Sequence, residues 1–136
     1  MGVWKTGLQN KCGMEERVYD LEERLTVFAA RVVVYVDLMP QTLAGRYYAG
    51  QLLRSGGSPA MHYGEAQGAE SDKDFIHKCG IALKELKESK VNLRIQLLSG
   101  LMPKTDEGLI WLTQECGELV RIVAKIIANK KKKGSG

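Results

Sequence analysis

The chain is short of the residues on which most catalytic and metal-binding sites are built. Its 136 residues include only two histidines and three cysteines. The cysteines are Cys12, Cys79 and Cys116. They form no CxxC pair and cannot all be joined within one chain, so we expect reduced thiols rather than a disulfide scaffold. Cys79 and Cys116 fall on apolar helical stripes, where a thiol behaves as a small buried hydrophobic group.

Long hydrophobic runs and nucleotide-binding loops are also missing. The longest run, Val32 to Val36, is far shorter than the ~20 residues that span a bilayer, and the N-terminus shows no secretory signal pattern. We therefore expect a cytoplasmic protein with no membrane partner. Neither G-x-x-x-x-G-K-S/T nor G-x-G-x-x-G occurs, which argues against nucleotide-driven mechanisms and leaves no cofactor to expect.

The residues that are present are those of one globular domain. Hydrophobic residues make up 44% and charged residues 26% of the chain, and its length allows a single core. The net charge is +4. From Lys104 onward there are seven basic and four acidic side chains, so the basic character is concentrated towards the end.

The first apolar pattern predicts a helix from Met14 to Met39, ended by Pro40. Its apolar residues are spaced alternately by three and four, which is a heptad stripe and indicates packing nearly parallel to neighbouring helices. The stripe consists of Val18, Leu21, Leu25, Phe28, Val32, Tyr35 and Met39.

A second helix is expected from about Thr42 to Gln67, with Gly56-Gly57-Ser58-Pro59 in its middle. Ser58 could cap a new helix with Pro59 in its first turn, or Pro59 could kink one continuous helix. We favour the kinked helix, because the other helices come out at similar lengths of roughly 25 residues and a bundle needs matched rods.

The third helix starts at the N-cap Ser71, with Asp74 completing a capping-box-like signature, and ends at Gly100 and Pro103. Thr105 opens the fourth. The stripe of the third helix is Phe75, Cys79, Ala82, Leu86 and Leu93, and that of the fourth is Leu109, Leu112, Cys116, Leu119, Val123 and Ile126. Short loops make consecutive helices antiparallel. The sequence thus predicts an all-α, up-and-down antiparallel four-helix bundle with a kinked second helix.

The domain layout follows: an N-terminal extension over residues 1–13, the bundle over 14–129 and a basic flexible tail over 130–136. The fourth helix is apolar beyond a single seam, because Ile110, Val120, Ile122 and Ile127 widen its stripe. Such a helix must bury a second face. Self-association is one way to do so, and coverage by the N-terminal extension is another.

Several linked motifs resemble those of one bacterial family. They are Gln51-Leu52-Leu53-Arg54-Ser55, Ser58-Pro59-Ala60, Glu65-Ala66, Ser71-Asp72-Lys73-Asp74-Phe75-Ile76-His77-Lys78 and Ile81-Ala82-Leu83-Lys84-Glu85-Leu86. In this order they resemble the small four-helix-bundle proteins encoded in intervening sequences of bacterial 23S ribosomal RNA genes. The likeness extends from about Val18 to Lys133, and it departs at His62, where the family usually has Asn.

The resemblance implies more than the fold. Relatives include the accessory variability protein of diversity-generating retroelements, a ring of five bundles that holds a reverse transcriptase and binds nucleic acid. It therefore implies a homo-oligomer, a pentamer by analogy, with RNA or DNA and a reverse transcriptase as candidate partners. It also implies that Arg54, Glu65 and Asp74 hold the helix junction as a structural motif.

Catalytic and metal chemistry find little support. His62 and Glu65 lie three residues apart and share a helical face, but di-iron bundles repeat Glu-x-x-His on two helices and that motif is absent here. Ser55 or Ser58 with His62 lacks a third orienting group and an oxyanion hole. We expect no metal, no catalytic residue and no enzymatic activity. The small residues around Gly56 more readily serve close helix packing.

Basic residues form the remaining candidate site. Lys73, Lys78, Lys90 and Arg94 are spread around the third helix, and the residues we expect to contact phosphate are Lys84, Lys87, Arg121, Lys125, Lys130, Lys131, Lys132 and Lys133. With few exposed aromatics, binding would be directed at the nucleic-acid backbone and tolerant of sequence. The alternative is a solvated face, with charge serving solubility and a protein partner bound elsewhere.

Overall fold

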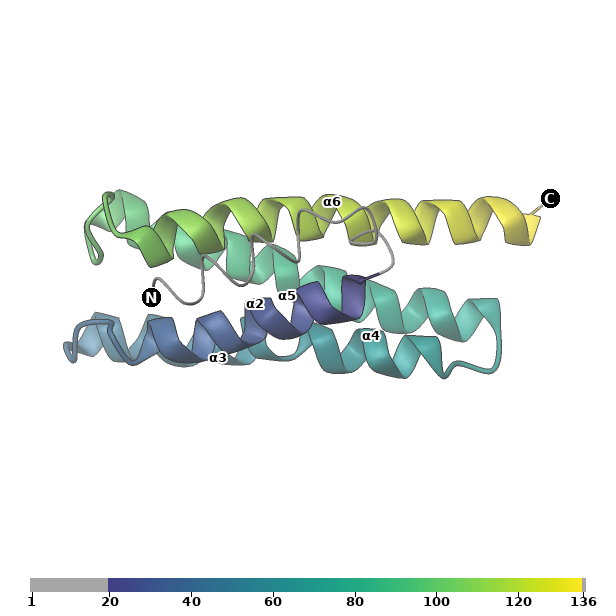
Figure 1. Ribbon diagram of the computed structural model, residues 1–136, viewed down its shortest axis with the longest axis horizontal. Coiled ribbons are helices and arrows are strands. Elements are labelled where there is room, and N and C mark those ends of the chain that lie inside the picture. Colours follow the sequence, from purple (N-terminus) through teal and green to yellow (C-terminus); the bar gives the residue numbers. More distant parts are fainter. Residues whose placement is uncertain (1–19, 136) are drawn as a thin grey trace.

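The computed structural model describes residues 20–135, with side chains as far as residue 133, and this range is helical without any strand (Figure 1). The segments are α2 (Leu21–Val36), α3 (Leu43–Gly57), α4 (Pro59–Gln67), α5 (Asp72–Ser99) and α6 (Glu107–Ser135). Because α3 and α4 form one bent helix, four rods pack as the predicted bundle. Met14 and Val18, predicted to belong to the first helix, lie outside the described residues, as does the N-terminal extension.

The core is built from the predicted heptad stripes. Every described member of the first stripe, from Leu21 to Met39, is buried. The stripe members from Cys79 to Leu93 on α5, and those from Leu109 to Val123 on α6, are buried as well. Phe75 and Ile126, which belong to the same two stripes, are partly buried. The three predicted stripes therefore meet along one axis, which confirms the packing that the spacing predicted. Leu52 of α3 and Ala66 of α4 add the buried side of the second helix.

The bend in the second helix lies at Ser58 and Pro59. Ser58 keeps helical backbone angles, φ −98° and ψ −22°, and its side chain does not cap α4. Pro59 has no N–H to donate to the preceding turn, and the Ser58 hydroxyl oxygen lies 2.9 Å from the Arg54 carbonyl oxygen. The favoured interpretation, one kinked helix, is confirmed.

Two loops with the same short motif close one end of the bundle. The α2–α3 loop contains Leu38-Met39-Pro40-Gln41-Thr42 and the α5–α6 loop contains Leu101-Met102-Pro103-Lys104-Thr105. Both methionines are buried, with 2% and 6% of their surfaces exposed, so they plug the core at this end. In each loop the proline prevents the preceding helix from continuing. Figure 1 shows both loops at the end opposite the α4–α5 loop.

The helix starts agree with the sequence at Ser71 and differ at Thr105. The Ser71 hydroxyl accepts from the Asp74 backbone N–H at 3.1 Å, as expected of an N-cap. On α6 the cap is Asp106 rather than Thr105, since its carboxylate accepts from the Leu109 N–H at 2.9 Å. The helix α6 continues to Ser135, in keeping with lysine being a good helix former. The flexibility expected of the basic tail over 130–136 stays a prediction.

A buried polar layer crosses the bundle near the two-loop end. The Tyr35 hydroxyl donates to the Gln96 side-chain oxygen at 2.6 Å, Gln96 donates to Asn92 at 2.7 Å, and Asn92 donates to the Tyr48 carbonyl at 3.1 Å. Burial raises the pKa of Tyr35 well above its usual value, so the phenol keeps the proton that it donates. Apolar periodicity could not predict this layer, which joins α2, α3 and α5.

The neighbouring glycines of α3 provide a matched test of packing. A Cβ at Gly56 would approach Val32 Cγ2 at 2.9 Å, whereas a Cβ at Gly57 would meet nothing within 4 Å. We expect Gly56→Ala to lower the free energy of unfolding by about 1–3 kcal/mol through overpacking. Gly57→Ala should leave it unchanged or raise it by up to about 1 kcal/mol. Urea unfolding measures both, and equal effects would contradict the close α2–α3 contact.

Candidate nucleic-acid interface

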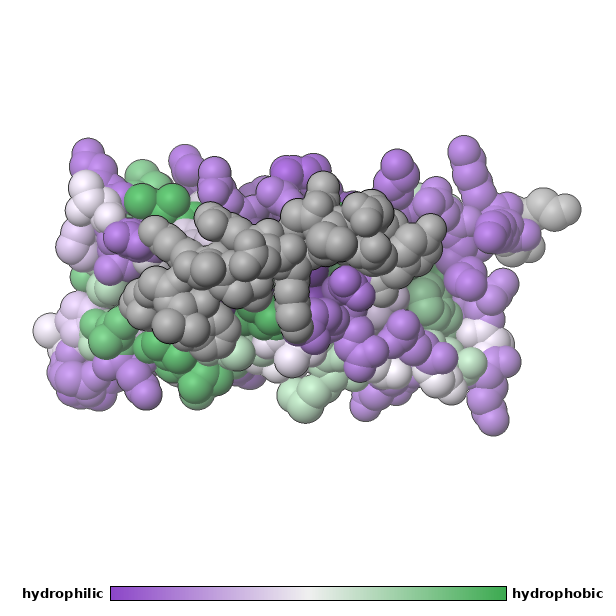
Figure 2. Space-filling model, in the orientation of Figure 1, coloured by the Kyte–Doolittle hydropathy of each residue, from purple (hydrophilic) through white to green (hydrophobic). Residues whose placement is uncertain are grey.

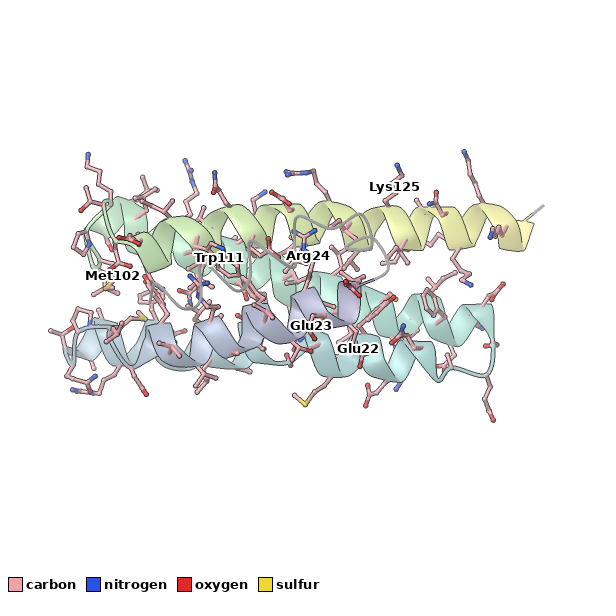
Figure 3. All side chains as sticks on the ribbon, in the orientation of Figure 1. Glu22, Glu23, Arg24, Met102, Trp111 and Lys125 are labelled. Atoms are coloured by element: carbon pink, nitrogen blue, oxygen red, sulfur yellow. The ribbon has the colours of Figure 1, made fainter. Side chains whose placement is uncertain are left out.

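The predicted phosphate-binding residues of the central bundle lie on the outer sides of two neighbouring helices. Lys84 and Lys87 are exposed on α5, and Arg121 and Lys125 are exposed on α6. Figure 3 shows Lys125 pointing away from the bundle. None of these four side chains takes part in an ion pair with another residue of the described range. They are therefore available to an external anion.

Two further cations, Lys90 and Arg94, join them on α5. Both are exposed and, within residues 20–133, neither makes an ion pair. Lys78 behaves differently, since it turns towards α4 and places its Nζ 3.7 Å from a Glu65 oxygen. Lys73 is also exposed, in the first turn of α5. Between that turn and the end of the bundle the α5–α6 side carries six exposed cations, namely Lys84, Lys87, Lys90, Arg94, Arg121 and Lys125. We call these six residues the cation set.

The lysines near the C-terminus are not equivalent to this set. Lys130 is half-buried, with its Nζ 3.7 Å from Asp72 Oδ1 and 4.8 Å from the centre of the Phe75 ring. It therefore fastens the end of α6 to the start of α5. Lys131 and Lys132 are exposed but have interaction partners, and Lys133 is exposed. Their roles in phosphate binding stay predictions.

Arg24 on α2 holds the glutamates of α6. Its guanidinium donates from Nε and Nη2 to the two carboxylate oxygens of Glu115, at 3.0 and 2.8 Å, and from Nη2 to Glu118 at 2.9 Å. Only 12% of the Arg24 side chain and 15% of Glu115 are exposed. The hydrogen bond with Glu115 raises the pKa of Arg24 above its already high value. Figure 3 shows Arg24 between α2 and α6.

Arg54 on α3 forms longer ion pairs with the glutamates of α5. Its two terminal nitrogens lie 3.6 Å from Glu85 and 3.5 Å from Glu88. Glu85 also accepts from the Ser58 hydroxyl and lies 3.3 Å from His62 Nε2. One carboxylate of α5 therefore contacts residues before, at and after the bend, a contact that sequence spacing could not reveal.

These two arginines explain why the outer α5–α6 side is basic. Between Phe75 and Ser99 the only acidic residues are Glu85 and Glu88, and from Gly108 onward they are Glu115 and Glu118. All four lie towards an arginine of α2 or α3. The six cations face outward, and Glu85 and Glu115 turn away from them towards the arginines. Glu88 and Glu118 also contact an arginine but stay 43% and 53% exposed. Cations still outnumber acidic residues on this side, which raises the local positive potential.

The predicted structural motif is spread over the bend and the next loop. Arg54 contacts α5 as described, and Glu65 lies 3.3 Å from His62 Nδ1, although its side chain is exposed. Asp74 occupies the first turn of α5, where its backbone N–H donates a hydrogen bond to the Ser71 hydroxyl oxygen. The three residues therefore serve separate contacts at the α3–α4–α5 junction.

The serine and histidine groups weighed for catalysis do not assemble. Ser55 is buried and shares a 2.7 Å hydrogen bond with Ser89, and the His62 ring contacts Glu65 and Glu85 rather than a serine. Within the described residues no three His, Cys, Asp or Glu side chains are arranged to hold a metal ion. Cys79 and Cys116 are buried as predicted, and burial raises the pKa of Cys116 to about 12.

The two arginines differ in burial, which makes their contributions to stability testable. Arg24→Met leaves Glu115 partly buried without its bidentate partner, so we expect a loss of about 2–3 kcal/mol in the free energy of unfolding. Arg54→Met should cost less than about 1 kcal/mol, because half of that side chain is exposed and exposed pairs contribute little.

Chemical denaturation measures both losses, and Arg24→Met with Glu115→Gln should recover part of the larger one. Equal losses from the two single substitutions would contradict the distinction between a tight pair and a loose one.

The chain was compared with protein families, curated proteins and solved structures. No protein-family model matches the chain, and no curated protein matches it. A solved structure from Bacteroides thetaiotaomicron, described as a protein of unknown function from the S23 ribosomal protein family, matches with a TM-score of 0.72 and 27% sequence identity. The match covers 79% of this chain and 97% of that one. The resemblance seen in the sequence is confirmed: the chain is a structural match to the S23 ribosomal protein family, the 23S rRNA intervening-sequence proteins.

Proposed function

We propose that this bundle is a non-enzymatic nucleic-acid-binding module that works as a homo-oligomer. The observation that carries the proposal is the sorting of charge: the cation set faces outward, while the four nearby glutamates are held by Arg24 and Arg54. Clustered cations whose nearby glutamates are paired with arginines suit the phosphate backbone. Few aromatic side chains accompany them, so sequence-specific readout is not expected.

A closed oligomer would multiply this charge, and α2 offers a surface for contact between copies. From Thr26 to Val36 the only charged residue is Arg31, which is 6% exposed and stacked on Trp111 at 4.1 Å. Val33 and Leu38 are exposed by 50% and 65%, and Figure 2 shows hydrophobic surface over α2 and α3 near the two-loop end. Apolar surface of this kind marks interaction sites.

This location differs from the one that the sequence suggested. The extra apolar residues of α6, Val120, Ile122 and Ile127, pack against the core, and of the predicted group only Ile110 is largely exposed. Self-association through α6 therefore loses its main support, and the α2 side takes its place. By analogy with the accessory protein of retroelements, the oligomer would be a pentamer, serving a reverse transcriptase or ribosomal RNA.

The second candidate function is a protein-interaction scaffold with no role in nucleic-acid binding. Eight large apolar side chains are exposed in the half of the bundle that ends in the two loops, which favours a protein partner there. They are Val33, Leu38, Leu43, Tyr47, Val91, Leu97, Leu98 and Ile110. Within the described residues no helix is long and apolar enough to cross a membrane.

Binding to labelled RNA and DNA at 50 and 200 mM salt separates the two functions. We expect affinity to fall more than about tenfold over this range, because four or more phosphate contacts release counterions. Lys84→Glu should weaken binding about five- to tenfold at low salt. Lys104→Glu, an equal change of charge in the exposed α5–α6 loop, should have a much smaller effect. Absence of binding even at 50 mM salt would leave the scaffold as the better account.

Sedimentation velocity tests the proposed contact between copies. We expect the unchanged chain to sediment as an oligomer, and Val33→Asp with Leu38→Asp to shift it towards single subunits, because charge on the α2 side opposes burial. Met61→Asp is the matched control, since Met61 is 65% exposed on α4, beyond the bend at Ser58. A folded monomer at high concentration would contradict self-association.

A further inference from the structure

The register of α5 against α6 sets the order of the cations along the bundle. Cys116 Sγ donates to the Leu86 carbonyl at 3.2 Å, and Lys130 lies 3.7 Å from Asp72. Residues 116 and 130 are as far apart in the chain as 86 and 72, so the two helices run antiparallel in step. Arg121 therefore lies at the level of residue 81, and Lys125 at the level of residue 77.

This register turns the cation set into a ladder. Along the bundle axis the order is Arg94, Lys90, Lys87 and Lys84 on α5, followed by Arg121 and Lys125 on α6. At about 1.5 Å per residue the steps are about 4.5 or 6 Å, and the ladder is about 26 Å long. It crosses from one helix to the next halfway, so an anion that follows it must pass obliquely over the α5–α6 edge.

A duplex cannot use such a path by taking the helix pair into a groove. Two packed helices are about 20 Å wide, from an interaxial distance of 8–10 Å and a diameter of 10–12 Å each, whereas the major groove of DNA is about 12 Å wide. The α5–α6 pair therefore cannot enter the groove as a single helix does. A stiff duplex resting on the convex bundle would meet only a few of the six cations.

A single strand has the flexibility that the ladder requires. Its phosphates are not held at the fixed rise of a duplex, so they can follow successive cations from α5 to α6. A shallow hollow on α5, lined by Gly80, Leu83, Val91, Lys84, Lys87 and Glu88, lies beside the middle of the ladder. An unpaired base can rest in this hollow, whereas bases in a duplex stay stacked inside it.

We propose that the cation ladder binds one extended single strand of nucleic acid, at about six nucleotides per chain, in preference to a duplex. This inference rests on the proposed nucleic-acid binding and specifies its substrate class. RNA and DNA share the phosphate chemistry that the ladder recognises, so both belong in the test.

Fluorescence anisotropy with the full chain tests the proposal. The probes are labelled oligo(U) and oligo(dT) of 4, 8 and 12 nucleotides, and 12-base-pair duplexes of RNA and of DNA. We expect the single strands to bind at least about tenfold more tightly than the duplexes. The slope of log K against log salt should be about −4 for six contacts, and a much stronger gain is expected from 4 to 8 nucleotides than from 8 to 12.

Two sets of variants keep the test specific. Lys87→Gln and Arg121→Gln, on different helices, should each make the slope for oligo(U) shallower by about 0.7, while Lys104→Gln should not change it. Gly80→Leu fills the hollow without a clash, since nothing lies within 4 Å of a Cβ there. It should weaken single-strand binding several-fold and leave the slope unchanged.

The outcomes are distinct from those that test the proposed function. Duplexes that bind as tightly as single strands would overturn the single-strand inference while keeping nucleic-acid binding. The single-strand inference would also be overturned if only one of the two substitutions, Lys87→Gln or Arg121→Gln, changed the salt dependence of oligo(U) binding. Failure of every probe to bind at low salt would overturn both proposals together.

Discussion

The burial of four apolar seams along one axis determines what every other residue can do. Once Phe28, Leu52, Leu86 and Leu119 meet in the core, the rotation of each helix about its own axis is fixed. Charged residues beside a seam then face the neighbouring helix, and those opposite a seam face solvent. Glu85 and Glu115 fall beside their seams and are largely buried, whereas Glu88 and Glu118 are more exposed. Most lysines fall away from the seams, so the packing constraint favours a basic outer side.

Arg24 and Arg54 hold glutamates of α5 and α6 towards the other half of the bundle. Each projects from the α2–α3 half of the bundle to glutamates on the α5–α6 half, so the ion pairs both join the two halves and draw acidic charge away from the outer side. The bend at Ser58 supports the second pair, because Glu85 contacts residues on both sides of it. Stability and surface charge thus depend on the same few contacts between helices.

Periodicity predicted the parts of this protein that depend on local spacing. The stripes, the kinked helix and the Ser71 cap could be derived because each depends on residues a few positions apart. The hydrogen bond from Tyr35 to Gln96, and the ion pairs of Arg24 and Arg54, could not be, since their partners are 31 to 94 residues away. The repeated Leu-Met-Pro-x-Thr loops were visible in the sequence, but only the fold shows that they close the same end.

The central claim is that α5 and α6 present the surface that nucleic acid contacts. Photo-crosslinking with an oligonucleotide that contains 4-thiouridine, followed by mass spectrometry of the linked peptides, tests it most directly. The account predicts crosslinks to peptides spanning Gly80 to Arg94 and Gly117 to Lys125. Crosslinks confined to α2 and α3, on the side where the apolar residues are exposed, would contradict it.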